Sequence, residues 1–296
     1  MIDGIDRFLL RKTEQSIVTR QNQWRRNFSS AVAYNQSVSE NRQRLAHILG
    51  VRDQRVRFDA PEPVATMTQP ALVGVGPGYQ VFSVRWPAIG EVYGEGLLLV
   101  PIGRDPVADI VAVPDADVYP EQLAGLVAGV PRESQYARRL AESGCRVIVP
   151  TLVDRRIGKR QSPHGGWSYR MSNREFLHRP AFVLGRHMIG YELQKVFAAV
   201  DWLETGGRAD AKDTDRSVGV IGWGEGGLIS LYAAAVDTRI DVACVSGYFD
   251  SRQRMWQEPL ERNVFGLLGE FGDAEVASLV APRALVVEAA PGPEVE

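Results

Sequence analysis

The stretch that decides the fold is residues 216–237, Arg-Ser-Val-Gly-Val-Ile-Gly-Trp-Gly-Glu-Gly-Gly-Leu-Ile-Ser-Leu-Tyr-Ala-Ala-Ala-Val-Asp. A short apolar run is followed by a glycine-rich turn and then by a longer apolar segment rich in alanine. Short apolar runs bounded by glycine are typical of buried strands, and longer apolar segments are typical of buried helices. The stretch therefore predicts a strand at 218–221, a tight turn and a helix.

The turn matches a nucleophile elbow, in which the pattern G-x-Nu-x-G presents a nucleophile on a sharp strand-to-helix turn. Gly222 and Gly226 stand in the two flanking positions, and Gly224 stands where the nucleophile belongs. Glycine has no side chain, so this position cannot attack a substrate. The sequence thus predicts the geometry of an elbow without its usual chemistry.

The same turn satisfies a second motif, the dinucleotide fingerprint G-x-G-x-x-G, through Gly222, Gly224 and Gly227. That motif expects an acidic residue about 20 positions further on, and Asp250 lies near that distance. The fingerprint normally follows the first strand of its domain, whereas four predicted strands precede the strand that leads into this turn. Strand order therefore favours the elbow, and nucleotide binding stays as an alternative.

Glu225 allows two further interpretations. As a carboxylate nucleophile it would place the bulky Trp223 two positions before the attacking residue, where the turn tolerates little. As a residue of the first helical turn it would interact favourably with the helix dipole. In the second case we expect Glu225→Gln to change stability by about 0.3–1 kcal/mol.

The composition is that of a globular protein. The chain has 296 residues, 45% of them hydrophobic, and a formal net charge of −2, enough for one α/β domain and an appendage. This charge gives no support to a nucleic-acid partner. Residues 1–15 lack the apolar centre of a signal peptide, and no run predicts a membrane span. An exported protein without its leader would look the same, so the compartment stays open.

Three parts are predicted: a helical N-terminal extension at 1–58, a connector at 59–74 and an α/β domain at 75–296. The expected elements of the α/β domain are a hairpin (79–86 and 94–101), strands (110–113, 145–153, 218–221, 240–246, 284–288), helices (133–143, 183–204 and one after the turn) and a polar insertion (155–180). A leading hairpin followed by alternating strands and helices predicts a mostly parallel sheet with helices on both faces.

Several segments resemble one family. They are Gly222-Trp-Gly-Glu-Gly-Gly-Leu-Ile, Tyr232-Ala-Ala-Ala, Arg239-Ile-Asp, Val245-Ser-Gly-Tyr-Phe and Ala281-Pro-Arg-Ala-Leu-Val-Val. Over residues 75–290 the chain resembles the acetyl xylan esterase and dienelactone hydrolase branch of the α/β-hydrolases, and most closely a bacterial group. The resemblance implies an α/β-hydrolase fold and carbohydrate esters as ancestral substrates.

Two departures from this family stand out. Gly224 replaces the nucleophilic serine, and the strand that presents the family's histidine would lie beyond Glu296. The chain is therefore expected to be a truncated piece of a longer protein.

The remaining residues offer no obvious substitute triad. A serine nucleophile needs a base within hydrogen-bond reach and an acid behind that base. The four histidines, none of which follows the last predicted strand, are His47, His164, His178 and His187. Ser246 ends a strand and could face the site, but no base is adjacent to it in sequence. Serine-dependent ester hydrolysis is therefore not expected.

Acidic residues follow several predicted strands at the edge where open α/β sheets bind ligands. They are Asp115, Asp117, Asp154, Glu225 and Asp250. Acids there would repel a developing oxyanion but suit a hydroxyl-rich ligand or a hard cation, and they also suit helix caps and solvated loops. Arginines in and near the insertion, among them Arg155 and Arg174, could pair with these acids or bind an anionic sugar.

Three functions follow. The first is an esterase-like protein that binds a small molecule or carbohydrate without hydrolysing it, with Asp154, His187, Ser246 and Asp250 as candidate ligand residues. The second is altered chemistry with Glu225 and Asp115 or Asp117 as acid and base. The third is nucleotide binding. No metal or cofactor is predicted, and the orientation of the acids discriminates between the first two functions.

Overall fold

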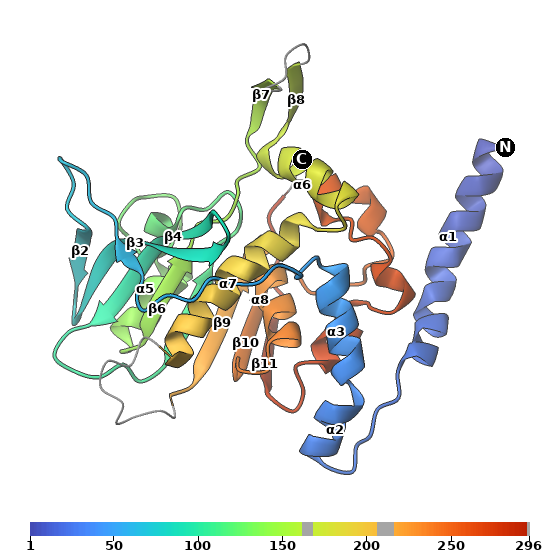
Figure 1. Cartoon of the computed structure of the whole chain (residues 1–296), viewed down its shortest axis with the longest axis horizontal. Coiled ribbons are helices and arrows are strands. Elements are labelled where there is room, and N and C mark those ends of the chain that lie inside the picture. Colours follow the sequence, from blue (N-terminus) through green and yellow to red (C-terminus); the bar gives the residue numbers. More distant parts are fainter. Residues whose placement is uncertain (162–167, 206–215, 295–296) are drawn as a thin grey trace.

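A mixed β-sheet forms the centre of the computed structural model, which describes residues 1–161, 168–205 and 216–294 (Figure 1). Within these residues the strand order is β1-β3-β4-β6-β5-β9-β10-β11, and β2 pairs with β3. The strands are β1 (Glu62–Pro63), β2 (Leu72–Gly76), β3 (Tyr79–Ile89), β4 (Val92–Pro101), β5 (Asp109–Val113), β6 (Arg146–Pro150), β9 (Val218–Trp223), β10 (Val242–Ser246) and β11 (Ala284–Glu288). The run from β6 to β11 is parallel, whereas β1 to β4 pair antiparallel. The predicted mixed sheet with a parallel core is confirmed.

Helices cover both faces of this sheet. One face packs against α7 (Met188–Thr205) and α8 (Glu225–Val236), and the other packs against α4 (Pro120–Leu123) and α5 (Tyr136–Glu142). Successive strand residues point to opposite faces, so in β6 Ile148 joins the first hydrophobic cluster while Val147 joins the second. Strands buried on both faces explain why the sequence reads as continuous apolar runs.

The polar insertion contains more structure than its sequence predicted. Within the described residues, β7 (Ile157–Gln161) and β8 (Ser168–Ser172) form a two-stranded sheet that projects from the body (Figure 1). The helix α6 (Asn173–Val183) follows, with the Ser172 side chain capping its first turn. The long helix predicted from residue 183 instead begins at Met188, because the chain reverses at Gly185, whose φ is 65°. Other predicted elements of the domain lie within three residues of their expected bounds.

The N-terminal segment forms α1 (Ile2–Thr19), the 3-10 helix η1 (Arg20–Gln23), α2 (Ala31–Ser37) and α3 (Ser39–Ile48). Buried Arg42 of α3 donates to the carbonyls of Ala235 and Leu279, which anchors α3 to the body. By contrast, α1 stands apart from the sheet, and Ser16 is its one buried residue (Figure 1).

The segment after β10 is irregular, as the sequence indicated. It contains three 3-10 helices and one short helix, η3 (Met255–Gln257), η4 (Leu260–Arg262), η5 (Leu267–Gly269) and α9 (Asp273–Ser278). Another 3-10 helix, η2 (Arg132–Ser134), precedes α5. In the part of the chain that the structure describes, no helix has the length and apolar character that crossing a membrane requires.

Candidate functional site

The glycine-rich turn joins β9 to α8 with the sharp geometry of an elbow. Gly224 has φ 61° and ψ −120°, and its N–H donates to the Ser246 carbonyl at 3.0 Å. A positive φ of this kind is readily adopted by glycine alone. The predicted strand, tight turn and helix are therefore present.

The other glycines of the turn are explained by close backbone approach. A Cβ atom on Gly226 would lie 2.6 Å from the Pro114 carbonyl oxygen, and one on Gly227 would lie 2.6 Å from that of Ser246. The turn is thus wedged between the ends of β5 and β10. Close packing of the backbone therefore accounts for these glycines, and binding of a nucleotide phosphate is not needed to explain them.

The space above Gly224 is filled by other parts of the chain. A Cβ atom placed on Gly224 would lie 2.7 Å from Asp115 Oδ1 and 2.7 Å from Pro293 Cδ. The tail that follows β11 is held there because Trp223 Nε1 donates to the Pro291 carbonyl at 3.0 Å. A nucleophilic side chain at position 224 would therefore have to displace both neighbours.

Asp115 also accepts a hydrogen bond from the backbone N–H group that would bind an oxyanion at this turn. In a working elbow the N–H of the residue after the nucleophile helps to bind the oxyanion. Here that residue is Glu225, and its N–H donates to Asp115 Oδ1 at 2.8 Å. A negatively charged carboxylate thus sits where the negative charge of a reaction intermediate would develop.

Glu225 is enclosed by three arginines. Its oxygens lie 2.5 Å from Arg174 Nη2, 2.8 Å from Arg262 Nη2 and 3.2 Å from Arg155 Nη2, and both Glu225 and Arg174 are 0% exposed. Burial acts to raise the pKa of Glu225, but the charges of Arg174, Arg262 and Arg155 outweigh it and lower the pKa to about 2. The carboxylate is therefore ionised at neutral pH and fully paired.

Arg155 brings the predicted acids together. Its Nη1 lies 2.7 Å from Asp115 Oδ2 and 3.0 Å from Asp117 Oδ2, and its Nη2 reaches Glu225. Burial raises the pKa of Asp115, but the hydrogen bond and charge of Arg155 lower it overall. Among the described residues, no group of three or more His, Cys, Asp or Glu is arranged to hold a metal ion. Asp115, Asp117 and Glu225 do converge, and the group they converge on is a guanidinium.

We call Glu225, Asp115, Asp117 and the arginines around them (Arg155, Arg174 and Arg262) the Glu225 cluster. Its member Arg262 and the neighbouring Pro293 carry no signal in the sequence. Arg262 lies in the irregular segment after β10, and Pro293 lies in the tail, so neither is part of a motif. The sequence does indicate that Arg155 and Arg174 of the insertion can pair with acids, and in the structure they do so.

Two other predicted ligand residues have different environments. Asp154 lies 2.5 Å from Arg156 Nη2 and accepts a hydrogen bond from Asn173. Ser246 Oγ donates to Glu288 Oε2 at 2.5 Å, so its partner is a carboxylate and not a base of the histidine type. Neither residue joins the Glu225 cluster through a hydrogen bond or ion pair between described residues.

His187 precedes α7 and is buried, at 3% exposure. Its Nδ1 accepts the Ile189 N–H at 3.0 Å, and its Nε2 lies 3.3 Å from the Asn263 carbonyl oxygen. Burial, followed by the neighbouring His178, lowers the pKa of His187 to about 4. The ring is therefore neutral at pH 7, and its Nδ1 is already hydrogen-bonded within the chain. His164, another histidine of the sequence, lies outside the described residues.

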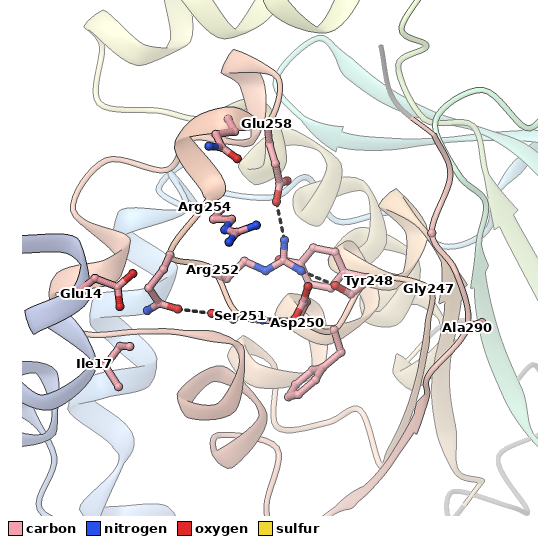
Figure 2. Close-up of a pocket in the computed structure, with 14 residues that line it drawn as sticks. Glu14, Ile17, Gly247, Tyr248, Asp250, Ser251, Arg252, Arg254, Glu258 and Ala290 are labelled. Atoms are coloured by element: carbon pink, nitrogen blue, oxygen red, sulfur yellow. Dashed lines mark hydrogen bonds and ion pairs between the residues drawn. The ribbon is translucent and has the colours of Figure 1, made fainter. Parts of the chain in front are cut away.

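Asp250 lines a cavity of about 740 Å³ at the carboxyl end of β10 (Figure 2). The wall combines the loop after β10, the tail after β11 and α1. Its residues are Glu14, Ile17, Gly247, Tyr248, Phe249, Asp250, Ser251, Arg252, Gln253, Arg254, Gln257, Glu258, Ala290 and Gly292.

Comparisons with known proteins identify the fold. No family model matches the sequence, and no curated protein matches it either. Among solved structures, a candidate acetyl xylan esterase from Bacteroides fragilis is 15% identical with a TM-score of 0.63, covering 86% of this chain and 68% of its own. A methylesterase is 18% identical with a TM-score of 0.54, covering 88% of this chain and 52% of its own. A glucuronoyl esterase from Solibacter usitatus is 14% identical with a TM-score of 0.52, covering 85% of this chain and 74% of its own.

The acetyl xylan esterase and the glucuronoyl esterase among these neighbours are carbohydrate esterases of the α/β-hydrolase fold. The chain therefore has that fold, as its sequence predicted, and it spans about half the length of the methylesterase.

Proposed function

We propose that this chain binds a carbohydrate and does not hydrolyse esters through a serine. One observation carries the proposal: Asp115 Oδ1 accepts the Glu225 N–H and also lies 2.7 Å from the position of a Cβ on Gly224. A single carboxylate oxygen thus accepts from the N–H group that would bind an oxyanion, and it also fills the space that a nucleophilic side chain at position 224 would need. In a serine hydrolase, loss of the nucleophile alone lowers turnover by roughly 10⁶.

Altered chemistry at Glu225 receives less support from the geometry. A general acid or base works best with a pKa near the working pH, whereas the pKa of Glu225 is about 2 and that of Asp115 is also lowered. Both carboxylates are committed to arginines. Exchanging a proton would require breaking ion pairs that are buried.

Nucleotide binding is also less well supported. A phosphate at a helix N-terminus is held by free backbone N–H groups. Here the N–H of Gly224 donates to Ser246 and that of Glu225 donates to Asp115. The Asp115 carboxylate would in addition repel a phosphate at this turn.

The choice of a carbohydrate rests on the fold neighbours. They include proteins described as acetyl xylan, methyl and glucuronoyl esterases, so acetylated and uronic-acid oligosaccharides are the ligands to test. A binding protein could keep the sugar-binding surface of such a fold without its reaction centre.

The test combines a hydrolysis assay with a binding assay. We expect no turnover of p-nitrophenyl acetate and no labelling by a fluorophosphonate, with an active serine esterase as the positive control. Gly224→Ser should remain unlabelled, because Asp115 already accepts from the Glu225 N–H and no histidine in the described part of the chain hydrogen-bonds at this turn. Isothermal titration calorimetry should detect binding of at least one oligosaccharide from a panel of neutral, acetylated and uronic-acid oligosaccharides.

Two results would contradict this function. Stoichiometric labelling, or turnover within tenfold of the control esterase, would reveal a nucleophile other than residue 224. Absence of binding across the whole panel would reject the carbohydrate ligand.

A further inference from the structure

We infer that the sugar binds in the cavity at the carboxyl end of β10, and that it is an uncharged, hydroxyl-rich sugar. This inference rests on the binding function proposed above and adds to it a place and a ligand class. The cavity volume of about 740 Å³ lies within the range of about 300–1,000 Å³ that ligand sites occupy. Its position at a strand's carboxyl end is where open α/β sheets bind ligands.

Three separate segments build the wall. The loop after β10 supplies most of it, the tail supplies Ala290 and Gly292, and α1 supplies Glu14 and Ile17 (Figure 2). α1 therefore closes one side of the cavity, which gives this projecting helix a role although Ser16 is its one buried residue.

A buried arginine, Arg252, holds the loop after β10 that lines the cavity. Arg252, 5% exposed, donates to Asp273 and Glu258 at 2.8 Å each, and its guanidinium lies 4.1 Å from the centre of the Tyr248 ring. Figure 2 shows the contact between Arg252 and Glu258. Such a network holds an otherwise irregular loop in one conformation, which lowers the entropic cost of binding.

The side chain of Gln253 leaves one hydrogen-bond donor unpaired. Gln253 is 8% exposed, and its Oε1 accepts from Ser251, but its Nε2 has no partner among the described residues. A buried donor left unsatisfied destabilises the conformation that buries it. This nitrogen is itself buried, so a ligand oxygen can accept from it only after the side chain turns towards the cavity.

The unpaired charges define the ligand class. Within the described chain, Arg254 forms no ion pair, and neither do the carboxylates of Glu14 and Asp250. One positive and two negative groups disfavour an anion, whereas sugar hydroxyls can donate to the carboxylates and accept from Arg254. Phe249, 37% exposed, adds an apolar surface for a sugar ring. The lining therefore favours a neutral sugar over a uronic acid.

Binding can be blocked from the α1 side. Ile17→Trp should fill part of the cavity and weaken binding of neutral tetrasaccharides (xylotetraose, cellotetraose, mannotetraose) at least tenfold in calorimetry. Val18→Trp is the matched control, because Val18 is 74% exposed and does not line the cavity. Both variants should unfold at the wild-type temperature, since both side chains lie at the surface.

A second pair of variants tests the donor. Arg254→Ala should weaken binding about tenfold, the effect of losing one hydrogen bond from a charged group. Arg132→Ala, which changes an exposed arginine elsewhere, should leave binding unchanged.

Each contrary outcome has a distinct meaning. Sugar binding that Ile17→Trp and Arg254→Ala leave unchanged would place the site elsewhere, and the proposed binding function would stand. Binding of glucuronic-acid oligosaccharides but not of the neutral tetrasaccharides would overturn the ligand class. Binding of no sugar at all would overturn both this inference and the function it extends.

Discussion

Replacing Glu225 by glutamine is expected to destabilise the protein by about 3–5 kcal/mol, the cost of breaking a buried ion pair by removing one partner. Glutamine keeps the shape of the side chain but removes the charge that Arg174, Arg262 and Arg155 surround. The helix-dipole interpretation of the sequence implied about 0.3–1 kcal/mol. Because Glu225 is buried among three arginines, we expect the larger loss of stability, about 3–5 kcal/mol.

Urea unfolding at pH 7 measures this difference directly. A loss of this size should also lower the melting temperature by roughly 10 °C for a domain of this length. Glu62→Gln is the control, because its carboxylate pairs with Arg85 at the surface with a side-chain exposure of 58%. Exposed pairs contribute about 0–1 kcal/mol, so the control should unfold close to wild type.

The pH dependence of the free energy of unfolding gives a second, independent measure of the contribution of Glu225. The folded pKa of Glu225, about 2, lies below an unfolded value of about 4.3. Its contribution is therefore complete above about pH 4.3 and is lost as the pH falls towards 2, by an amount on the order of 3 kcal/mol. Glu225→Gln should lack this loss. A variant within 1 kcal/mol of wild type at pH 7, with the wild-type acid slope, would refute the reasoning.

Two further predictions concern buried groups outside the cluster. The pKa of His187, about 4, lies below an unfolded value of about 6.5, so the histidine's contribution to stability is lost as the pH falls from 6.5 to 4. In His187→Gln the urea concentration at the unfolding midpoint should change less between pH 7 and pH 4.5 than it does in the wild type. An equal change in both proteins would contradict this. Arg42→Met leaves the carbonyls of Ala235 and Leu279 without their donor, so it should cost about 2–4 kcal/mol and speed proteolysis of residues 25–38. Exposed Arg25→Met is its control, and unchanged proteolysis in Arg42→Met would show that α3 is anchored by other contacts.

Much of the fold could be predicted because its signals are local. The apolar runs of β5, β6, β9 and β10 mark buried strands, and the glycines of residues 222–227 specify a close-packed turn. The sequence also placed Asp115, Asp117 and Glu225 at one edge of the sheet, since the carboxyl ends of parallel strands meet there.

The chemistry of the cluster could not be predicted because its charge partners come from distant segments. Arg174 is 51 residues before Glu225 in the chain, and Arg262 is 37 residues after it. Both lie in regions of weak periodicity, so no spacing rule pairs them with Glu225. The onset of α7 was missed for a similar reason, because apolar residues continue from α6 through the reversal at Gly185.

The absence of a side chain at Gly224 also changes where the fold is most stable. Enzymes commonly hold reacting residues in sparsely populated backbone conformations, at a cost of about 1–3 kcal/mol each, and draw their moving parts from regions of low local stability. At this turn glycine meets the positive φ with little strain, the amides of Gly224 and Glu225 are hydrogen-bonded, and the nearby carboxylates are neutralised. A position that enzymes commonly hold under strain is therefore hydrogen-bonded and closely packed here, and we expect the amides of Gly224 and Glu225 to exchange with solvent as slowly as those of the surrounding strands.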